Sequence, residues 1–248
     1  MSHIFFNKLL ISFHGRLFIY LHIKSLKLKT YNMKKIVLNL FTVALIGLSV
    51  VACKSDAKEA KTGEAQEVAE NNEAAKYKAD AENSMIIWKA NKVVGGHEGT
   101  IHVSNGVAQL QGDQLVGGSF IFDLNTIACT DIPAEEKSNA KLVGHLKSDD
   151  FFDVANHPTA AFEITKVDGN TVSGNLTIKG IKKNITFPAN VTVTGDEIAI
   201  TSDTFTIDRT EWDIMYNAGT TPDIAASLGD KMIKDDIEIK IMVKATKA

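Results

Sequence analysis

A run of alternating residues between Thr171 and Asp213 constrains the fold more than any other part of the sequence. Apolar side chains recur there at every second position, as at Leu176 and Ile178, which is the period of a β-strand with one buried face. Turn signals such as Gly180 and Gly195 separate these segments and allow the chain to reverse between antiparallel strands. We therefore expect a meander with one apolar face. Such a meander curls or stacks to bury that face, and closing into a barrel also removes the exposed strand edges.

The same alternation predicts further strands on both sides of the meander, over residues 85–94, 99–103, 107–111, 115–127, 159–167 and 236–245. Residues 133–153 instead have helical spacing with a start signal at Ser148-Asp149, and a short helix is expected from Pro222, capped by Thr221, to Gly229. About eight or nine strands with short inserted helices predict an all-β fold, with one antiparallel β-barrel domain over residues 84–248. A barrel of this size is filled by its own side chains or holds one small ligand, and the alternation fits both.

Three segments precede this domain. Residues 1–32 are apolar but interrupted by charges, so they are interpreted as an upstream extension or untranslated sequence, with Met33 as the true start. A basic start, the apolar run 36–51 and the small residues before Cys53 resemble a bacterial lipoprotein signal peptide over 33–52. Cys53 would then be the lipidated first residue of the mature protein; the alternative is a transmembrane anchor with a chance cysteine. Residues 53–83 are rich in Lys, Glu, Ala and Asn, which predicts a flexible, solvated tether.

This organisation places the protein at the bacterial cell envelope. A lipid anchor would attach it to the membrane, with the folded domain in the periplasm or exposed at the surface. The formal net charge is −3, with 23% charged residues, so no basic surface for nucleic acid is expected. Gly117-Gly118-Ser119-Phe120 lacks the second glycine of a nucleophile elbow, and no opposed pair of carboxylates stands out. We therefore expect a protein that is not an enzyme and uses no cofactor.

Several segments, in matching order from Ser84 to the C-terminus, resemble the YceI-like family of lipid- and polyisoprenoid-binding domains of the bacterial periplasm and envelope. They are Trp88 with residues 96–101 (GHEGTI), 145–153 (HLKSDDFFD) with 157–162 (HPTAAF), 176–180 (LTIKG), 205–212 (FTIDRTEW) and 235–239 (DDIEI). The resemblance implies an extended, lipocalin-like antiparallel β-barrel of about eight strands, whose apolar cavity holds a long isoprenoid or fatty-acyl chain. The family's arginine-aspartate pair before the His-Leu-Lys-Ser-like segment is replaced here by Asn139-Ala140-Lys141, so contacts to a lipid head group are expected to differ.

The resemblance and the alternation together define the expected lipid-binding residues. They are apolar side chains that face the interior of the barrel. Alternatively, the same side chains form a packed core without ligand, as in a structural or interaction module. A lipid-acting enzyme is the least favoured alternative. The expected lining residues are Phe120, Phe122, Phe162, Ile164, Leu176, Ile178, Phe187, Phe205, Ile207 and Ile239.

Four polar or aromatic residues are candidates for contacts to the lipid head group: His97, His145, Arg209 and Trp212. Arg209 is the only arginine after residue 16. Its guanidinium suits a pyrophosphate group, and the alternative is an ion pair that holds a strand end.

The histidines and cysteines do not form a recognisable metal motif, so no metal site is expected. Cys129 has no partner if Cys53 is acylated, which predicts a buried free thiol. The resemblance makes a long-chain lipid the expected ligand. The sequence does not decide between a monomer and a homodimer. The residues that would suggest a metal by type, but lack close ligand spacing, are His97, His102, His145, His157, Asp149 and Asp150.

Overall fold

The computed structural model describes residues 57–68, 71 and 73–248, and the predictions for residues 1–32, 33–52 and Cys53 lie outside this part of the chain. Its strands form one sheet and are connected mostly by short turns. The strands are β1 (Lys58–Glu59), β2 (Lys61–Glu64), β3 (Ala75–Ala79), β4 (Met85–Lys92), β5 (Gly96–Gln111), β6 (Gln114–Cys129), β7 (Thr159–Asp168), β8 (Thr171–Ile178), β9 (Ile181–Thr194), β10 (Glu197–Ser202), β11 (Phe205–Asp208) and β12 (Ile233–Lys247). The helical elements are α2 (Lys137–Lys147), α3 (Pro222–Leu228) and the 3₁₀ turns η1 (Arg209–Trp212) and η2 (Gly229–Lys231).

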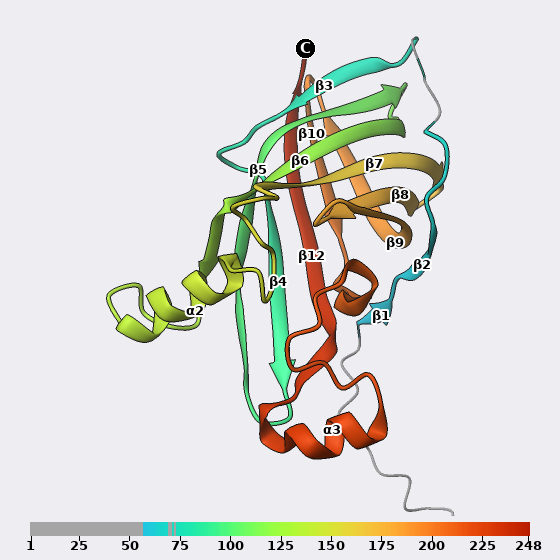
Figure 1. Cartoon of the computed structure of the whole chain (residues 1–248). Helices are drawn as coiled ribbons and strands as arrows, with labels where there is room; N and C mark the ends of the chain where they lie inside the picture. Colours follow the sequence, from blue (N-terminus) through green and yellow to red (C-terminus); the bar gives the residue numbers. More distant parts are fainter. Residues whose placement is uncertain (1–56, 69–70, 72) are drawn as a thin grey trace, which may run out of the picture. The chain divides into compact units, whose positions relative to one another are not determined.

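Eight strands close into an antiparallel ring (Figure 1). β4 to β10 pair in sequence order, β10 pairs with β12, and β12 pairs with β4 to complete the circle. The predicted all-β barrel with short helices is therefore confirmed. Lys179 and Gly180 both have positive φ in the two-residue turn between β8 and β9, as a tight hairpin requires.

One predicted turn is instead a bulge. Residues 99–103 and 107–111 were expected as two strands, but β5 is continuous through Ser104, Asn105 and Gly106. The register with β6 shifts between Val103 and Asn105, so Ser104 is the extra residue. The Asn105 side chain accepts a hydrogen bond from Gly106 N, which stabilises the local kink. Turn-forming residues therefore bend the strand here without ending it.

The segment expected to be a solvated tether contributes three strands. β3 pairs with β5 on one side and with the end of β12 on the other, so it extends the ring where β4 ends. β2 pairs with the part of β9 that β10 does not cover, and β1 pairs with β11. Small buried residues, such as Ala60 and Ala79, accompany these strands. Backbone hydrogen bonds at open strand edges thus order a stretch whose composition suggests disorder.

Two α-helices lie within the long connections between strands: α2 between β6 and β7, and α3 between β11 and β12. The second, α3, begins after Thr221, whose hydroxyl accepts from Ile224 N, and ends at Gly229, as predicted. The expected helix start at Ser148-Asp149 is wrong, because Ser148 instead ends α2 and its hydroxyl donates to His145 O. No helix in the described residues has the length and apolar character needed to cross a membrane.

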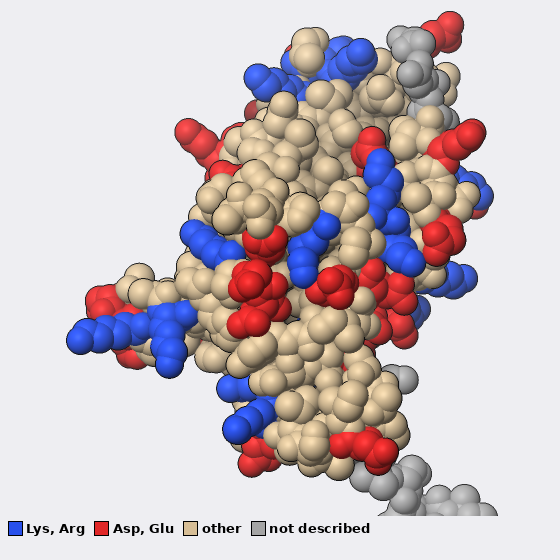
Figure 2. All heavy atoms as spheres, in the orientation of Figure 1, with Lys and Arg blue, Asp and Glu red and all other residues tan. Residues whose placement is uncertain are grey.

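The outer surface carries charges of both signs. On the face shown in Figure 2, basic and acidic side chains are interspersed among uncharged areas, and several basic side chains lie together at the top of the view.

Candidate functional site

The interior of the ring is divided into a packed part and a hollow part. Around β3 and the paired ends of β5 and β12, side chains such as Tyr77, Leu110 and Val243 are buried and do not line the cavity described next. Further along the barrel lies a cavity of about 190 Å³ whose exposed surface is apolar. A water molecule occupies roughly 10–15 Å³ of such a volume. The barrel interior is therefore only partly filled by its own side chains.

Most of the predicted apolar set lines this cavity. The alternation along each strand that buries these side chains also points them toward the interior of the barrel. Three of the rings are neighbours: the ring centroids of Phe162 and Phe187 are 5.5 Å apart, and those of Phe187 and Phe205 are 4.5 Å apart. Phe120 and Ile164 are buried in the packed part and do not line the cavity. The predicted residues that do line it are Phe122, Phe162, Leu176, Ile178, Phe187, Phe205, Ile207 and Ile239.

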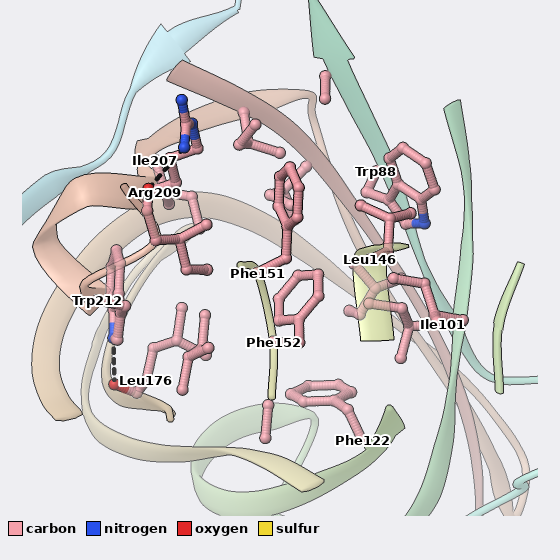
Figure 3. Close-up of a pocket in the computed structure, with 18 of the residues that line it drawn as sticks. Trp88, Ile101, Phe122, Leu146, Phe151, Phe152, Leu176, Ile207, Arg209 and Trp212 are labelled. Atoms are coloured by element: carbon pink, nitrogen blue, oxygen red, sulfur yellow. Dashed lines mark hydrogen bonds between the residues drawn. The ribbon is translucent and has the colours of Figure 1, made fainter. Parts of the chain in front are cut away.

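A large part of the wall was not predicted. In Figure 3, Phe151 and Phe152 project between Trp88 and Leu146 on one side and Arg209 and Trp212 on the other. They belong to the connection after α2, which folds back over the barrel interior. Leu142 and Leu146 share one face of α2, a spacing of four residues that the sequence contains. The wall residues outside the predicted set also include Ile86, Trp88, Ala90, Ile101, Leu124, Ile127, Ala160, Ile185, Ile214, Ile233, Ile237 and Ile241.

Arg209 lines the cavity, and each of its three guanidinium nitrogens donates a hydrogen bond to a main-chain carbonyl. Its guanidinium donates to the carbonyls of Ile214 at 2.6 Å, Ile233 at 3.2 Å and Lys234 at 3.2 Å, and it lies 3.5 Å from an Asp235 oxygen. The side chain is only 3% exposed. Burial lowers the pKa of Arg209 from its ordinary value, while the charge of Asp235 opposes this effect. This geometry fits the alternative in which Arg209 holds a strand end.

Trp212 has a similar structural setting. Its ring is fully buried, and its Nε1 donates to Leu176 O at 3.2 Å. η1 therefore fixes both Arg209 and Trp212 against the ends of neighbouring strands, and the face of the indole contributes to the apolar wall.

The two candidate histidines lie in different places. His97 lines the cavity, and its Nδ1 lies 2.9 Å from an Asp131 oxygen. His145 is not part of the wall; its ring contacts Phe151 and Tyr216 edge to face, and its Nε2 lies 2.8 Å from an Asp150 oxygen. Of the two, only His97 is placed where it could touch a ligand in the cavity.

Cys129 is a buried free thiol beside Asp131, as expected for a cysteine without a disulfide. Its thiol donates to Asp131 Oδ1 at 3.1 Å. Burial, followed by this acceptor, raises the pKa of Cys129. Partial burial opposes ionisation of Asp131, but hydrogen bonds from the Glu98 N–H, the Cys129 thiol and the His97 ring lower its pKa to about 2. Asp131 is thus an ionised acceptor with converging donors.

Comparison with known proteins places this geometry in a family. The family model of the YceI-like domain matches residues 77–245. A UPF0312 protein of Pseudomonas aeruginosa is 34% identical over 90 residues, covering 32% of this chain and 47% of the relative. A UPF0312 protein of Yersinia pestis is 34% identical over 92 residues, again covering 32% and 47%. The matched region thus spans about half the length of these relatives.

Two solved structures share the fold. BcnA of Burkholderia cenocepacia aligns with a TM-score of 0.52 and 19% identity, covering 68% of this chain and 99% of that protein. A polyisoprenoid binding domain from Saccharophagus degradans, implicated in plant cell wall breakdown, aligns with a TM-score of 0.51 and 15% identity, covering 71% and 100%. At these identities the likeness concerns the fold.

Proposed function

The chain belongs to the YceI-like family, and we propose that it binds a long-chain isoprenoid or a similar lipid in the apolar cavity of its barrel. The observation that carries this proposal is the cavity itself. Aromatic and aliphatic side chains make up most of its wall, which also includes Lys92, His97 and Arg209 but no Ser, Thr, Cys, Asp or Glu. An apolar cavity of this size does not hold water well, but it accepts apolar ligands.

The energy available from such a ligand is sufficient. Burial of each CH₂ group contributes about 0.8 kcal/mol, so a few isoprene units would contribute several kcal/mol before the entropy of association is subtracted. Two further facts support the ligand class. The family model matches most of the barrel, and one structural neighbour is described as a polyisoprenoid binding domain.

The protein would act as a carrier or a sequestering protein at the bacterial envelope, attached to the membrane through acylated Cys53. This part of the proposal rests on the lipoprotein-like signal sequence before Cys53. The proposal contains no chemical step.

A packed interaction module is the second candidate. The dense packing around Tyr77 and Leu110 is what that reading requires, but the hollow around Phe187 and Phe205 favours a ligand.

Extraction of the purified full-length protein with organic solvent, followed by mass spectrometry, tests the proposal. We expect a lipid with a long hydrocarbon chain at close to one molecule per protein. As a control, the variant Ile178→Trp, which fills the cavity, is extracted in parallel. Absence of lipid from the wild type, together with no binding of an added fluorescent polyprenyl probe, would contradict the lipid proposal.

A further inference from the structure

We propose that His97, Cys129 and Asp131 form a binding site for a divalent transition-metal ion of the Zn²⁺ class. Each residue offers one ligand atom, namely His97 Nδ1, Cys129 Sγ and an Asp131 carboxylate oxygen, and these atoms lie within 4.8 Å of one another. The inference does not rest on lipid binding.

Antiparallel pairing brings the three residues together. Gly99 on β5 is paired with Cys129 on β6. The pairing continues beyond the strand end, where Thr130 N donates to Glu98 O at 2.9 Å. In this register His97 lies opposite Asp131, although the two residues are 34 positions apart in sequence. A motif search with close ligand spacing therefore misses the cluster.

The cluster is held by groups that are not ligands. The Glu98 N–H donates to Asp131 Oδ1 at 2.9 Å, which orients the carboxylate. Asn139 on α2 is buried, and its amide donates to the carbonyls of Cys129 at 3.1 Å and Ile132 at 2.7 Å. Such outer contacts fix the position of ligand atoms before a metal binds.

The hydrogen-bond contacts within the cluster show which interactions a bound ion would replace. The Cys129 thiol donates to one Asp131 oxygen at 3.1 Å, and His97 Nδ1 lies 2.9 Å from the other. A metal ion would replace these two contacts. The thiol releases its proton to solvent, the ring proton of the neutral imidazole moves from Nδ1 to Nε2, and the freed Nδ1 lone pair binds the ion.

The ligand atoms lie close enough to one another to share a single ion. In a tetrahedral Zn²⁺ site, bonds of about 2.1 Å to nitrogen and oxygen and about 2.3 Å to sulfur put the ligand atoms roughly 3.4–3.6 Å apart. With Asp131 Oδ2 as the oxygen ligand, its 2.9 Å contact to His97 Nδ1 would lengthen by roughly half an ångström, and Cys129 Sγ lies within 4.8 Å of the other ligand atoms. His97 and Asp131 are partly exposed, with 32% and 29% of their side-chain surfaces accessible, which leaves water as the fourth ligand.

The ligand types select the metal class. Thiolate and imidazole favour Zn²⁺, Co²⁺ and similar ions, whereas Ca²⁺ and Mg²⁺ require mostly oxygen ligands. The pair of His145 and Asp150 is a natural comparison, since its nitrogen–oxygen distance is 2.8 Å but no cysteine belongs to it. We expect no comparable affinity there.

Titration with Co²⁺ under reducing conditions tests the proposal. The full-length chain carries two cysteines, so Cys53→Ser leaves Cys129 as the only thiol. We expect one equivalent of Co²⁺ to bind with a thiolate-to-metal charge-transfer band in the near ultraviolet. In that background, Cys129→Ser should abolish the band. His97→Gln and Asp131→Asn should weaken binding about tenfold or more, since even the loss of outer contacts costs ten- to a hundredfold.

The matched control is His145→Gln, which should bind Co²⁺ like the parent. Added Zn²⁺ should raise the Tm of the parent and of this control, but not that of Cys129→Ser. Circular dichroism verifies that each variant is folded, and if Cys129→Ser is not, His97→Gln and Asp131→Asn decide. Absence of saturable one-to-one binding by the parent, or unchanged affinity in folded variants of the three ligands, would overturn the proposal. Neither result depends on whether lipid is bound.

Discussion

Phe187 and Phe205 stack face to face, with 4.5 Å between ring centroids and 8° between ring planes. Phe187 lies on β9 and Phe205 on β11, two strands that are not hydrogen-bonded to each other. The stack therefore connects two parts of the cavity wall through side chains alone. Such a pair contributes about 0.5–1.5 kcal/mol beyond its buried area. It holds the wall in place around a volume that side chains do not fill.

Filling this volume should separate ligand binding from stability. Ile178 lines the cavity, and Ile164 is equally apolar and buried but belongs to the packed part. Ile178→Trp is expected to reduce co-purified lipid with little loss of stability, because the larger ring occupies ligand volume. Ile164→Trp should destabilise the barrel by about 1–3 kcal/mol through overpacking. Urea unfolding and lipid extraction on the same preparations check both results; equal destabilisation by the two substitutions would indicate a packed interior throughout.

The strand β3 should contribute to stability although it lies in the stretch expected to be a tether. Tyr77 on this strand is buried, whereas its neighbour Lys78 is exposed. Truncation of a large buried ring costs about 3 kcal/mol or more, so Tyr77→Ala should lower the unfolding free energy by about that amount, while Lys78→Ala should change it little. Chemical denaturation of both variants provides the measurement. Equal unfolding midpoints for wild type and Tyr77→Ala would mean that β3 is dispensable.

The sequence predicts strands that bury a face of apolar side chains, but not strands such as β1 and β2 that are ordered by backbone pairing. Alternation of side chains predicts β8, β9 and β12, because each buries one continuous apolar face. β1 and β2 bury no side chain of their own, and Ala60 between them is the buried residue of this stretch. Backbone pairing with β11 and β9 orders the two strands. That pairing depends on which strand edges the closed ring leaves open, and no local pattern encodes it.

In the candidate site too, a local sequence pattern predicts some residues, whereas others take their place only in the assembled barrel. Residues such as Phe187 and Ile178 were predicted because strand period and cavity wall coincide. Phe151 and Phe152 were missed because they lie on a connection, where direction follows from how the segment packs back on the barrel. The contact between His97 and Asp131 depends on the register of β5 and β6 past two irregularities, the bulge at Ser104 and the shift between Thr100 and His102. Register over such a distance is a property of the assembled sheet.

Arg209 should behave as a structural residue. Its removal leaves three main-chain carbonyls, among them Ile214 O, without their charged donor, and hydrogen bonds to charged groups contribute about 1.5–3 kcal/mol each. Arg209→Ala is expected to lower the unfolding free energy by at least about 3 kcal/mol, while the folded fraction retains its lipid. Arg209→Lys, which keeps the charge but not the fork, should recover only part of the loss. Loss of lipid at unchanged stability would instead assign Arg209 to the head group.

The turn between β3 and β4 should make a contribution that depends on pH. Hydrogen bonds, first from the Asn83 side chain and then from backbone N–H groups, lower the pKa of Asp80 below 3.8. A lowered folded-state pKa stabilises the fold above pH 3.8, and this contribution is lost as the pH falls through the folded-state value. Asp80→Ala should therefore be less stable than wild type at pH 7, with a difference that shrinks below pH 3.8. Paired urea titrations measure it, and a difference independent of pH would show that the charge is not involved.

Gly174 should be required to keep the ring of Phe162 in its place in the cavity wall. Gly174 on β8 lies beneath the Phe162 ring, and a Cβ at this position would come within 2.3 Å of the ring's outermost carbon and 2.7 Å of Glu163 O. Gly174→Ala must displace the ring or the strand, so we expect a loss of about 1–3 kcal/mol from overpacking. Gly144 on α2 is the control, because nothing lies within 4 Å of its added Cβ. Gly144→Ala should stabilise the protein by up to about 1 kcal/mol, since alanine favours a helix more than glycine does.

A double-mutant cycle identifies the contact responsible. If the ring of Phe162 is the main obstacle, Phe162→Leu should remove much of the cost of Gly174→Ala, giving a coupling energy of about 1 kcal/mol or more between the two positions. Additive effects would mean that the backbone at Glu163 O opposes the methyl group instead. Because Phe162 also contacts Phe187, the displaced ring should alter the wall, and Gly174→Ala is expected to release part of the bound lipid. Full lipid occupancy in a destabilised Gly174→Ala protein would show that the strand has moved and the ring has not.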